Sequence, residues 1–261
     1  NNWEEIAHLS SENRTGCCTS ILFRDTPDGP ILGKTTDIEP AQVSDYFLYD
    51  ILPEHGFHML ILGKIGTLKC EAGMNEKGLC AGSNSSIEQN METGHIERMT
   101  LLRRTLQQCG DVDAALDFLK ERRCYRLGLN ITLTDIGGRS VVAECGNTGM
   151  SVREISQDAG FATNHYITPK MSARYDYKIW YYQNSLDRYA FLKEKLTDGL
   201  AERTVEGMKR LMKEHPEKGA ICNHTDCCVT MYATIWMLRS RTVLLCDGRP
   251  CEKGYIPYRL V

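Results

Sequence analysis

The sequence predicts a layered α+β domain with largely antiparallel sheets. Strand-like and helix-like segments occur in separate blocks rather than in strict alternation, which is typical of this class. No low-complexity linker and no repeat of solenoid period divides the chain. The length of 261 residues suits one large domain or two small ones, and 42% hydrophobic with 25% charged residues is typical of a globular protein.

A β-hairpin is expected first. Residues 18–23 are strand formers, and Asp28-Gly29 is a strong turn signal. Residues 31–36 form the second strand, with Asp37 at its end. Further strand-like runs follow at residues 57–63, 67–71 and 79–83.

Two helices are predicted next, over residues 96–109 and 113–122. Gly110 ends the first, and Asp111 is the expected N-cap of the second. The remaining elements are strands at 129–134, 140–144 and 160–163, helices at 185–196 and 204–214, and strands at 228–237 and 242–246.

Charge and hydropathy exclude several function classes. The net charge is only −3 and no lysine- or arginine-rich tract occurs, so neither nucleic acid nor an anionic membrane surface is an expected partner. The longest apolar runs, such as residues 57–62, fall far short of the roughly 18 residues that span a bilayer. The expected partner is a small molecule or a peptide.

The twelve cysteines bear on the compartment. Several lie in apolar strand-like runs, as Cys80 and Cys246 do, where free thiols behave as small hydrophobic groups. This favours a cytoplasmic location. Secretion is the alternative, supported by Asn-X-Ser/Thr sequons at Asn13, Asn84, Asn130 and Asn223. With neither an initiator methionine nor a signal peptide, the chain is expected to start inside a longer precursor, after a removed segment, or where order begins.

Two constellations carry reactive groups. Cys17-Cys18 stands at the start of the hairpin, and Lys34 and Asp37 lie on its second strand, an arrangement that can activate a thiol. Asn84 ends an apolar strand, where its amide could donate to an oxyanion. From the residues alone, an ordinary surface hairpin and a turn-capping asparagine remain open.

Taken together, these segments resemble the choloylglycine hydrolase and penicillin acyltransferase superfamily of N-terminal-nucleophile (Ntn) hydrolases, and most closely its acyl-coenzyme A:6-aminopenicillanic acid acyltransferase branch. The resemblance covers residues 18–260. Its motifs are Cys18-Thr19-Ser20, the strand at 33–37, the Gly-Met-Asn-Glu-Lys-Gly-Leu stretch at 73–79, Phe161 to His165, Asn184 to Tyr189, and the tail from Gly248. It implies a four-layer αββα sandwich with two packed, mainly antiparallel sheets, and no cofactor.

The resemblance also implies roles for individual residues. Cys18 is the nucleophile, because Thr19 and Ser20 fix that register, and Cys17 is the alternative. Asp37 holds the new α-amino group, and Arg188 lies near the nucleophile. Asn84 and Asn164 are the oxyanion and amine-orienting asparagines. Lys34 stands where bile-salt hydrolases have arginine, so the charge is kept but the bidentate fork is lost.

The implied mechanism begins with a cut before the nucleophile, so that residues 1–17 are a leader and 18–261 the catalytic domain. The freed α-amine, with a pKa near 8, serves as the base. A thioester forms; water resolves it in a hydrolase and an amine resolves it in an acyltransferase. An inert, uncut domain and a papain-like thiol enzyme that uses His165 are the alternatives, and a homo-oligomer remains open.

A third segment, residues 222–228, contains metal-ligand residue types. Its spacing does not repeat as a two-knuckle zinc site would. The sequence therefore predicts free thiols there and no metal.

Overall fold

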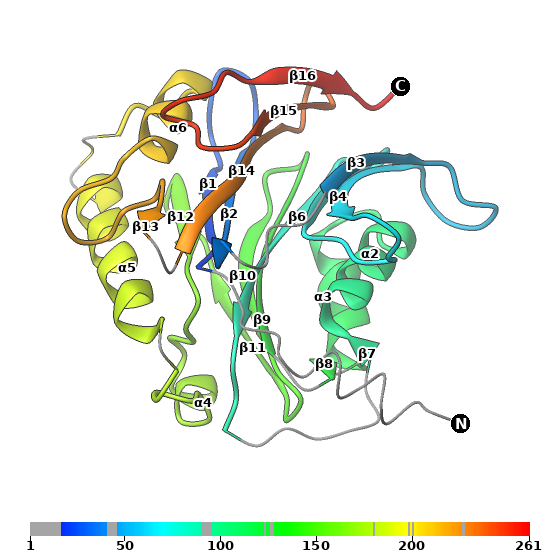
Figure 1. Cartoon of the computed structure of the whole chain (residues 1–261). Coiled ribbons are helices and arrows are strands. Elements are labelled where there is room, and N and C mark those ends of the chain that lie inside the picture. Colours follow the sequence, from blue (N-terminus) through cyan, green and yellow to red (C-terminus); the bar gives the residue numbers. More distant parts are fainter. Residues whose placement is uncertain are drawn as a thin grey trace.

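The computed structural model describes residues 17–40, 46–89, 96–122, 124–125, 128–179, 181–197, 199, 201–225 and 228–261. Residues 1–16, which make up almost all of the expected leader, lie outside these ranges. Two seven-stranded sheets face each other, and helices cover the outer face of each (Figure 1). None of the described helices is long and apolar enough to cross a membrane.

The first sheet contains the predicted hairpin. Its strand order is β12-β1-β2-β14-β15-β16, with β13 paired to β14, and neighbouring strands are antiparallel. The strands are β1 (Thr19–Phe23), β2 (Ile31–Ile38), β12 (Ala159–Ala162), β13 (His224–Thr225), β14 (Cys228–Met237), β15 (Thr242–Asp247) and β16 (Ile256–Arg259).

The second sheet is also antiparallel, in the order β11-β10-β9-β6-β5-β4-β3. Its strands are β3 (Tyr46–Ile51), β4 (Met59–Lys64), β5 (Ala72–Asn75), β6 (Leu79–Ser86), β9 (Gly128–Asp135), β10 (Ser140–Cys145) and β11 (Met150–Glu154). A short parallel pair, β7 (Ile96–Glu97) with β8 (Cys124–Tyr125), stands apart.

The helices lie on the outer faces of the sandwich (Figure 1). On the second sheet these are α2 (Arg98–Gln108) and α3 (Val112–Lys120); on the first they are α5 (Tyr182–Thr197) and α6 (Val205–Met212), with the short α4 (Pro169–Ser172) nearby. The predicted N-cap Asp111 accepts a hydrogen bond from Ala114 N, and Thr204 caps α6 by accepting one from Gly207 N.

Three apolar layers separate the four structural layers. Leu22 and Leu32 alternate with Ile21 and Ile31 along the hairpin, so one pair faces the opposite sheet and the other faces the helices. Leu22 and Leu32 belong to the layer between the two sheets. Ile21 and Ile31 belong to the layer that separates the first sheet from helices α5 and α6. A third layer fills the space between the second sheet and helices α2 and α3. The predicted αββα sandwich is confirmed.

Several predicted boundaries differ from the structure, and the hydrogen bonds give the cause of two of these differences. The strand expected at residues 67–71 is irregular before Glu71: Cys70 N donates to Met99 O of α2, whereas Glu71 N donates to Leu62 O of β4. The strand instead begins at Ala72. The helix expected from residue 96 begins at Arg98, since Glu97 caps it through a bond from Thr100 N.

A β-bulge interrupts the pairing of β2 with β14. Asp37 pairs with Thr230, and Thr36 pairs with Tyr232, so Met231 is an extra residue. Because of this extra residue, Thr230 and Tyr232 point to opposite faces of the sheet, although they are two residues apart. Thr230 reaches Asp37 on the helix side, whereas Tyr232 joins the layer between the sheets.

Candidate active site

Strand β1 sends its side chains alternately toward the opposite sheet and toward the helices. Ser20 Oγ donates to Asn84 Oδ1 at 2.6 Å, across to β6 of the other sheet. Thr19 Oγ1 instead accepts from Arg188 Nη1 on α5, at 2.9 Å. Cys18 directly precedes β1 and is two residues before Ser20, so the alternation of side chains places its thiol on the same side as Ser20, between the sheets.

The Cys18 thiol is buried among charges. Burial raises its pKa above the ordinary value, while the nearby Lys34 ammonium works against that shift. The carboxylates of Glu71 and Asp37 raise the pKa further, and a hydrogen bond from the Asp37 backbone lowers it. Attack by this thiol therefore requires a base that takes its proton.

Cys17 lies in a different environment. It packs in an apolar cluster with Ile87, Tyr181 and Cys228. A hydrogen bond between the two thiols is the largest cause of the raised pKa of Cys228. Cys17 N donates to Asp37 O at 2.8 Å, which places it opposite Asp37 and on the helix side. Adjacent cysteines thus face opposite sides of the sheet.

Lys34 and Glu71 form a buried ion pair beside Cys18. The Lys34 ammonium is 3.7 Å from Glu71 Oε2 and donates to Thr36 Oγ1 at 2.7 Å. Tyr46 Oη donates to the other Glu71 oxygen at 3.4 Å. The Lys34 ammonium therefore lies on the face of β2 between the sheets, where its positive charge favours the thiolate form of Cys18.

Asp37 lies near the end of β2, and its side chain is buried on the helix side of the sheet. Its two carboxylate oxygens accept from Thr230 Oγ1 at 2.5 Å and from Asn223 Nδ2 at 2.9 Å. Burial nevertheless raises the pKa of Asp37 to about 6, against the opposing effects of Arg188, of these two hydrogen bonds and of Lys34. A positive group beside this carboxylate would lower that pKa.

Arg188 joins the Cys18 segment to the Asn164 segment. Its Nη1 donates to the Cys18 carbonyl oxygen at 2.6 Å, and its Nη2 donates to Asn164 Oδ1 at 2.7 Å. Nε donates to Asn184 Oδ1 at 2.8 Å, one turn earlier on α5. The planar guanidinium thus fixes the backbone of Cys18 from the helix side.

The Asn164 side chain has partners at both ends. Beside the bond from Arg188, its Nδ2 donates to Ser85 O at 3.0 Å. Its backbone carbonyl accepts from Tyr175 Oη at 2.7 Å, and the Tyr175 ring packs against Tyr166 and Tyr182. Asn164 therefore braces β6 against the first sheet.

Asn84 differs from Asn164 in this respect. Its Oδ1 accepts from Ser20, but its Nδ2, fully buried, has no hydrogen-bond partner within the described residues. A buried donor without a partner costs free energy, about 1–3 kcal/mol by comparison with other proteins. Such a donor is suited to an oxygen that carries negative charge only during reaction.

His165 is not arranged as a base for Cys18. Its Nδ1 contacts Ser185 Oγ at 2.8 Å and Thr163 Oγ1 at 3.2 Å. Burial, together with Arg188 and Arg153, lowers its pKa to about 4. These contacts give a papain-like pair no support.

The structure brings together six of the predicted site residues around the start of β1: Cys18, Lys34, Asp37, Asn84, Asn164 and Arg188. Cys17, the alternative to Cys18, packs in the apolar cluster instead. It adds Glu71, Asn223 and Thr230, for which the sequence predicted no part in the site, and it gives Ser20 of the Cys18 motif a contact with Asn84. Glu71 stands two residues before the Gly73 motif, and that adjacency was the one available signal.

Three of the four sequons are inside the protein. Asn84 and Asn130 are fully buried and Asn223 is 1% exposed, so none of them can carry a glycan in the folded chain. Asn13 lies outside the described residues.

Solved structures of low sequence identity share this fold. An N-acylethanolamine-hydrolyzing acid amidase ortholog from Caenorhabditis elegans matches with a TM-score of 0.56 at 13% identity, over 85% of this chain and 93% of that one. A penicillin V acylase from Agrobacterium tumefaciens gives 0.53 at 12%, over 88% and 83%. A conjugated bile acid hydrolase from Clostridium perfringens gives 0.51 at 14%, over 93% and 96%.

Sequence comparisons give the family. No curated protein matches significantly. The family model described as acyl-coenzyme A:6-aminopenicillanic acid acyl-transferase matches residues 24–251, which include Lys34, Asp37, Asn84, Asn164 and Arg188 and begin after Cys18. This match covers most of the chain, and the chain therefore belongs to the acyl-coenzyme A:6-aminopenicillanic acid acyl-transferase family.

Proposed function

We propose that the protein is a cysteine N-terminal-nucleophile enzyme that cleaves a linear amide bond through a thioester on Cys18. One observation carries the proposal: Ser20 of β1 anchors Asn84 across the sheets, on the same side of the sheet as Cys18, and the Nδ2 of Asn84 has no hydrogen-bond partner among the described residues. A nucleophile and a dry, preformed donor on the same face are what stabilisation of a tetrahedral intermediate requires.

The first step is self-processing. The Cys18 thiol attacks the carbonyl carbon of Cys17, the Cys17–Cys18 peptide bond breaks, and the nitrogen of Cys18 takes up a proton. Water then hydrolyses the resulting thioester, which releases residues 1–17 with a carboxyl end and leaves a free α-amine on Cys18. Arg188 supports this step by holding the Cys18 carbonyl oxygen at 2.6 Å.

Turnover uses the freed amine as base. With a pKa near 8 it takes the proton of the Cys18 thiol, which burial keeps protonated. The thiolate attacks the substrate carbonyl, and the oxyanion accepts from Asn84 Nδ2. The base then gives its proton to the leaving amine, and water resolves the thioester.

Neighbouring groups have supporting roles. Asp37 holds the α-amine, because a carboxylate favours the charged form of a nearby amine. Lys34 favours the thiolate, and the Glu71 carboxylate beside it keeps that ammonium compensated in the interior. Asn164 positions Arg188 by accepting from its Nη2, and its own orientation is fixed by the bond from Nδ2 to Ser85 O.

Whether water or an amine resolves the thioester decides between hydrolase and acyltransferase. The family description favours transfer, whereas the names of the similar structures favour hydrolysis. A suitable substrate panel contains bile-acid conjugates, N-acylethanolamines and penicillin V, each assayed with and without an added acceptor amine. Release of free acid without acceptor identifies the hydrolase.

The decisive experiment compares the two adjacent cysteines. Cys18→Ala should abolish both leader cleavage and turnover, while Cys17→Ala should leave turnover within a few-fold of wild type, because Cys17 faces the apolar cluster. Intact mass detects cleavage, and amine release from the panel measures turnover. The reverse result would assign the nucleophile to Cys17, and full turnover by uncut protein would eliminate the α-amine as base.

A further inference from the structure

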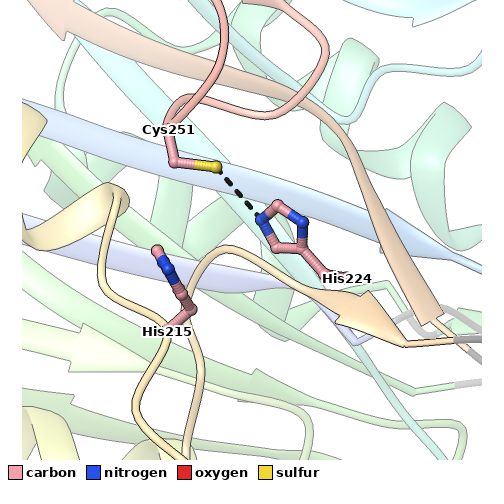
Figure 2. A group of neighbouring side chains, drawn as sticks. All are labelled: His215, His224 and Cys251. Carbon is pink, nitrogen blue, oxygen red and sulfur yellow. Dashed lines mark hydrogen bonds between the residues drawn. The ribbon is translucent and has the colours of Figure 1, made fainter.

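A second group of reactive side chains lies outside the candidate active site. Cys222, His224 and Cys251 are mutual neighbours, and His215 lies beside His224 and Cys251 (Figure 2). They come from the loop after α6, from β13 with the residues before it, and from the turn between β15 and β16. Residues far apart in sequence thus place two thiols and two imidazoles together.

The spacing of these atoms is that of ligands around one ion. Cys222 Sγ is 3.6 Å from Cys251 Sγ and 3.4 Å from His224 Nε2, and His224 Nε2 is 3.1 Å from Cys251 Sγ. In a tetrahedral zinc site with bonds of about 2.3 Å to sulfur and about 2.0 Å to nitrogen, ligand atoms lie about 3.5–3.8 Å apart. The three atoms therefore need to separate only slightly.

His215 supplies a fourth donor. Its ligand atom lies within 4.8 Å of those of His224 and Cys251. Its Nδ1 is 2.7 Å from Lys213 O, so the ring proton is on Nδ1 and the Nε2 lone pair is available. The ring is exposed, which leaves it free to move toward a bound ion.

The remaining charged neighbours form an outer shell. Arg249 Nη1 donates to His224 Nδ1 at 2.9 Å, and Arg249 Nε is 3.1 Å from Glu252 Oε2. Glu252 Oε1 is 3.8 Å from the same His224 nitrogen. When Nε2 of His224 binds a cation, the proton of the neutral ring is on Nδ1. Glu252 then accepts a hydrogen bond from this Nδ1–H, and Arg249 remains paired with Glu252.

We propose that Cys222, His224, Cys251 and His215 bind one Zn²⁺ ion. Two thiolates and two imidazoles form the donor set that zinc prefers in closed structural sites, and binding releases the two thiol protons to solvent. This revises the expectation of free thiols, which rested on the spacing within residues 222–228. The partners His215 and Cys251 lie outside that segment, so local spacing carried no signal of them.

The ion would join the loop before β14 to the turn at Cys251. Asn223, between two of the ligands, donates its side-chain amide to Asp37 and its backbone N–H to Thr230 Oγ1. The zinc site would thus hold in place a segment that contacts the candidate active site, without contacting substrate itself.

The test measures metal rather than activity. The reduced full-length chain, stripped with a chelator, is titrated with Zn²⁺ against a chromophoric competitor and with Co²⁺ by absorption spectroscopy. We expect one ion per chain, with the intense visible bands of tetrahedral cobalt and a thiolate-to-cobalt charge-transfer band. Loading should raise the melting temperature, because the ion binds the folded chain, where the four ligands are assembled, more tightly than the unfolded chain.

Variants assign the ligands. Cys251→Ser should weaken Zn²⁺ binding by more than the roughly 10–100-fold typical of an outer-shell change, which is the effect expected of Glu252→Gln. The side chain of His215 is exposed, so His215→Ala tests the fourth ligand without disturbing the fold. Cys246→Ala, a buried thiol nearby that is not among the ligands, should leave affinity unchanged.

Three results would overturn the proposal. They are the absence of stoichiometric Zn²⁺ uptake, an equal loss of affinity in Cys246→Ala, and cobalt spectra without the charge-transfer band. A mass two hydrogens lower that maps to a Cys222–Cys251 disulfide, with no zinc uptake after reduction, would replace the metal site with a redox pair.

Discussion

The two ends of the Asn84 side chain have different partners. Oδ1 is fixed by Ser20, whereas Nδ2 has no partner within the described residues. The bond at Oδ1 orients the amide, so that Nδ2 is aimed before any substrate arrives. This is the preorganisation that makes a single donor effective in a dry site.

Asn84→Ala should lower kcat by about 10²–10³, the cost of losing one oxyanion donor. Ser20→Ala is the matched control, because it removes the other half of the same hydrogen bond and keeps the donor. Its loss in kcat should be smaller, by tenfold or more. Equal losses in the two variants would assign Asn84 a purely structural role.

Asp37 predicts a pH-dependent stability. Its pKa in the folded chain is about 6, above the ordinary 3.8, so the folded chain holds the proton longer than the unfolded chain does. Stability therefore falls as pH rises through the window from about 4 to about 6. The Asn variant lacks this titration.

The measurement is urea unfolding of Cys18→Ala and of Cys18→Ala with Asp37→Asn, both of which keep the leader under the proposal. From pH 4 to pH 7 the parent should lose up to about 3 kcal/mol of unfolding free energy relative to the Asn variant. The comparison cancels any pH-independent change in hydrogen bonding. A difference that stays constant or rises with pH would contradict the shifted pKa.

The sequence predicted some of these residues and not others for a physical reason. Cys18, Asp37 and Asn84 lie in motifs or at strand ends, where local pattern is informative. Asn223 and Thr230 contact Asp37 from 186 and 193 residues away. Such contacts follow from strand order, which no local pattern in a single sequence specifies.

At the scale of elements, the start of α3 was predictable because its cap, Asp111, is a local signal. Asp111→Ala should lower the unfolding free energy by about 0.5–2 kcal/mol, since Ala114 N loses its acceptor. Asp117→Ala, on the exposed face of the same helix, should change it by no more than about 0.5 kcal/mol. Chemical denaturation measures both, and equal effects would show that the cap contributes nothing.

Strands were harder to predict than helices. The edge strand β16 contains Pro257 and is exposed throughout, so it lacks the apolar alternation that marks a strand. β3 is only partly buried along its length. Edge strands such as these are stabilised by the pairing that follows collapse, and their own residues give a weak signal.

At the scale of the whole molecule, the layer between the sheets holds both the core and the candidate site. Leu32 is fully buried in that layer, and it lies close to Gly82 of β6. Any loosening of the two sheets would therefore separate Ser20 from Asn84 as well.

Leu32→Ala should cost about 2–5 kcal/mol of unfolding free energy, from lost apolar burial and the cavity left behind. Leu52→Ala, at a side chain that is 81% exposed, is the matched control and should stay within about 0.5 kcal/mol. Urea denaturation compares them. A small effect at Leu32 would mean that the sheets repack easily around the missing side chain.

The extra residue in β14 matters for anyone who exchanges parts between relatives of this protein. Met231 allows one strand to present Thr230 to Asp37 and Tyr232 to the opposite sheet. If a graft omitted this residue, the strand would still pair, but one half would be inverted. Either the Asp37 carboxylate would lose a hydrogen-bond donor or the interior would lose an aromatic ring. Chimeras should therefore exchange β14 as a whole. An alignment with a relative that lacks the extra residue should place the gap at Met231.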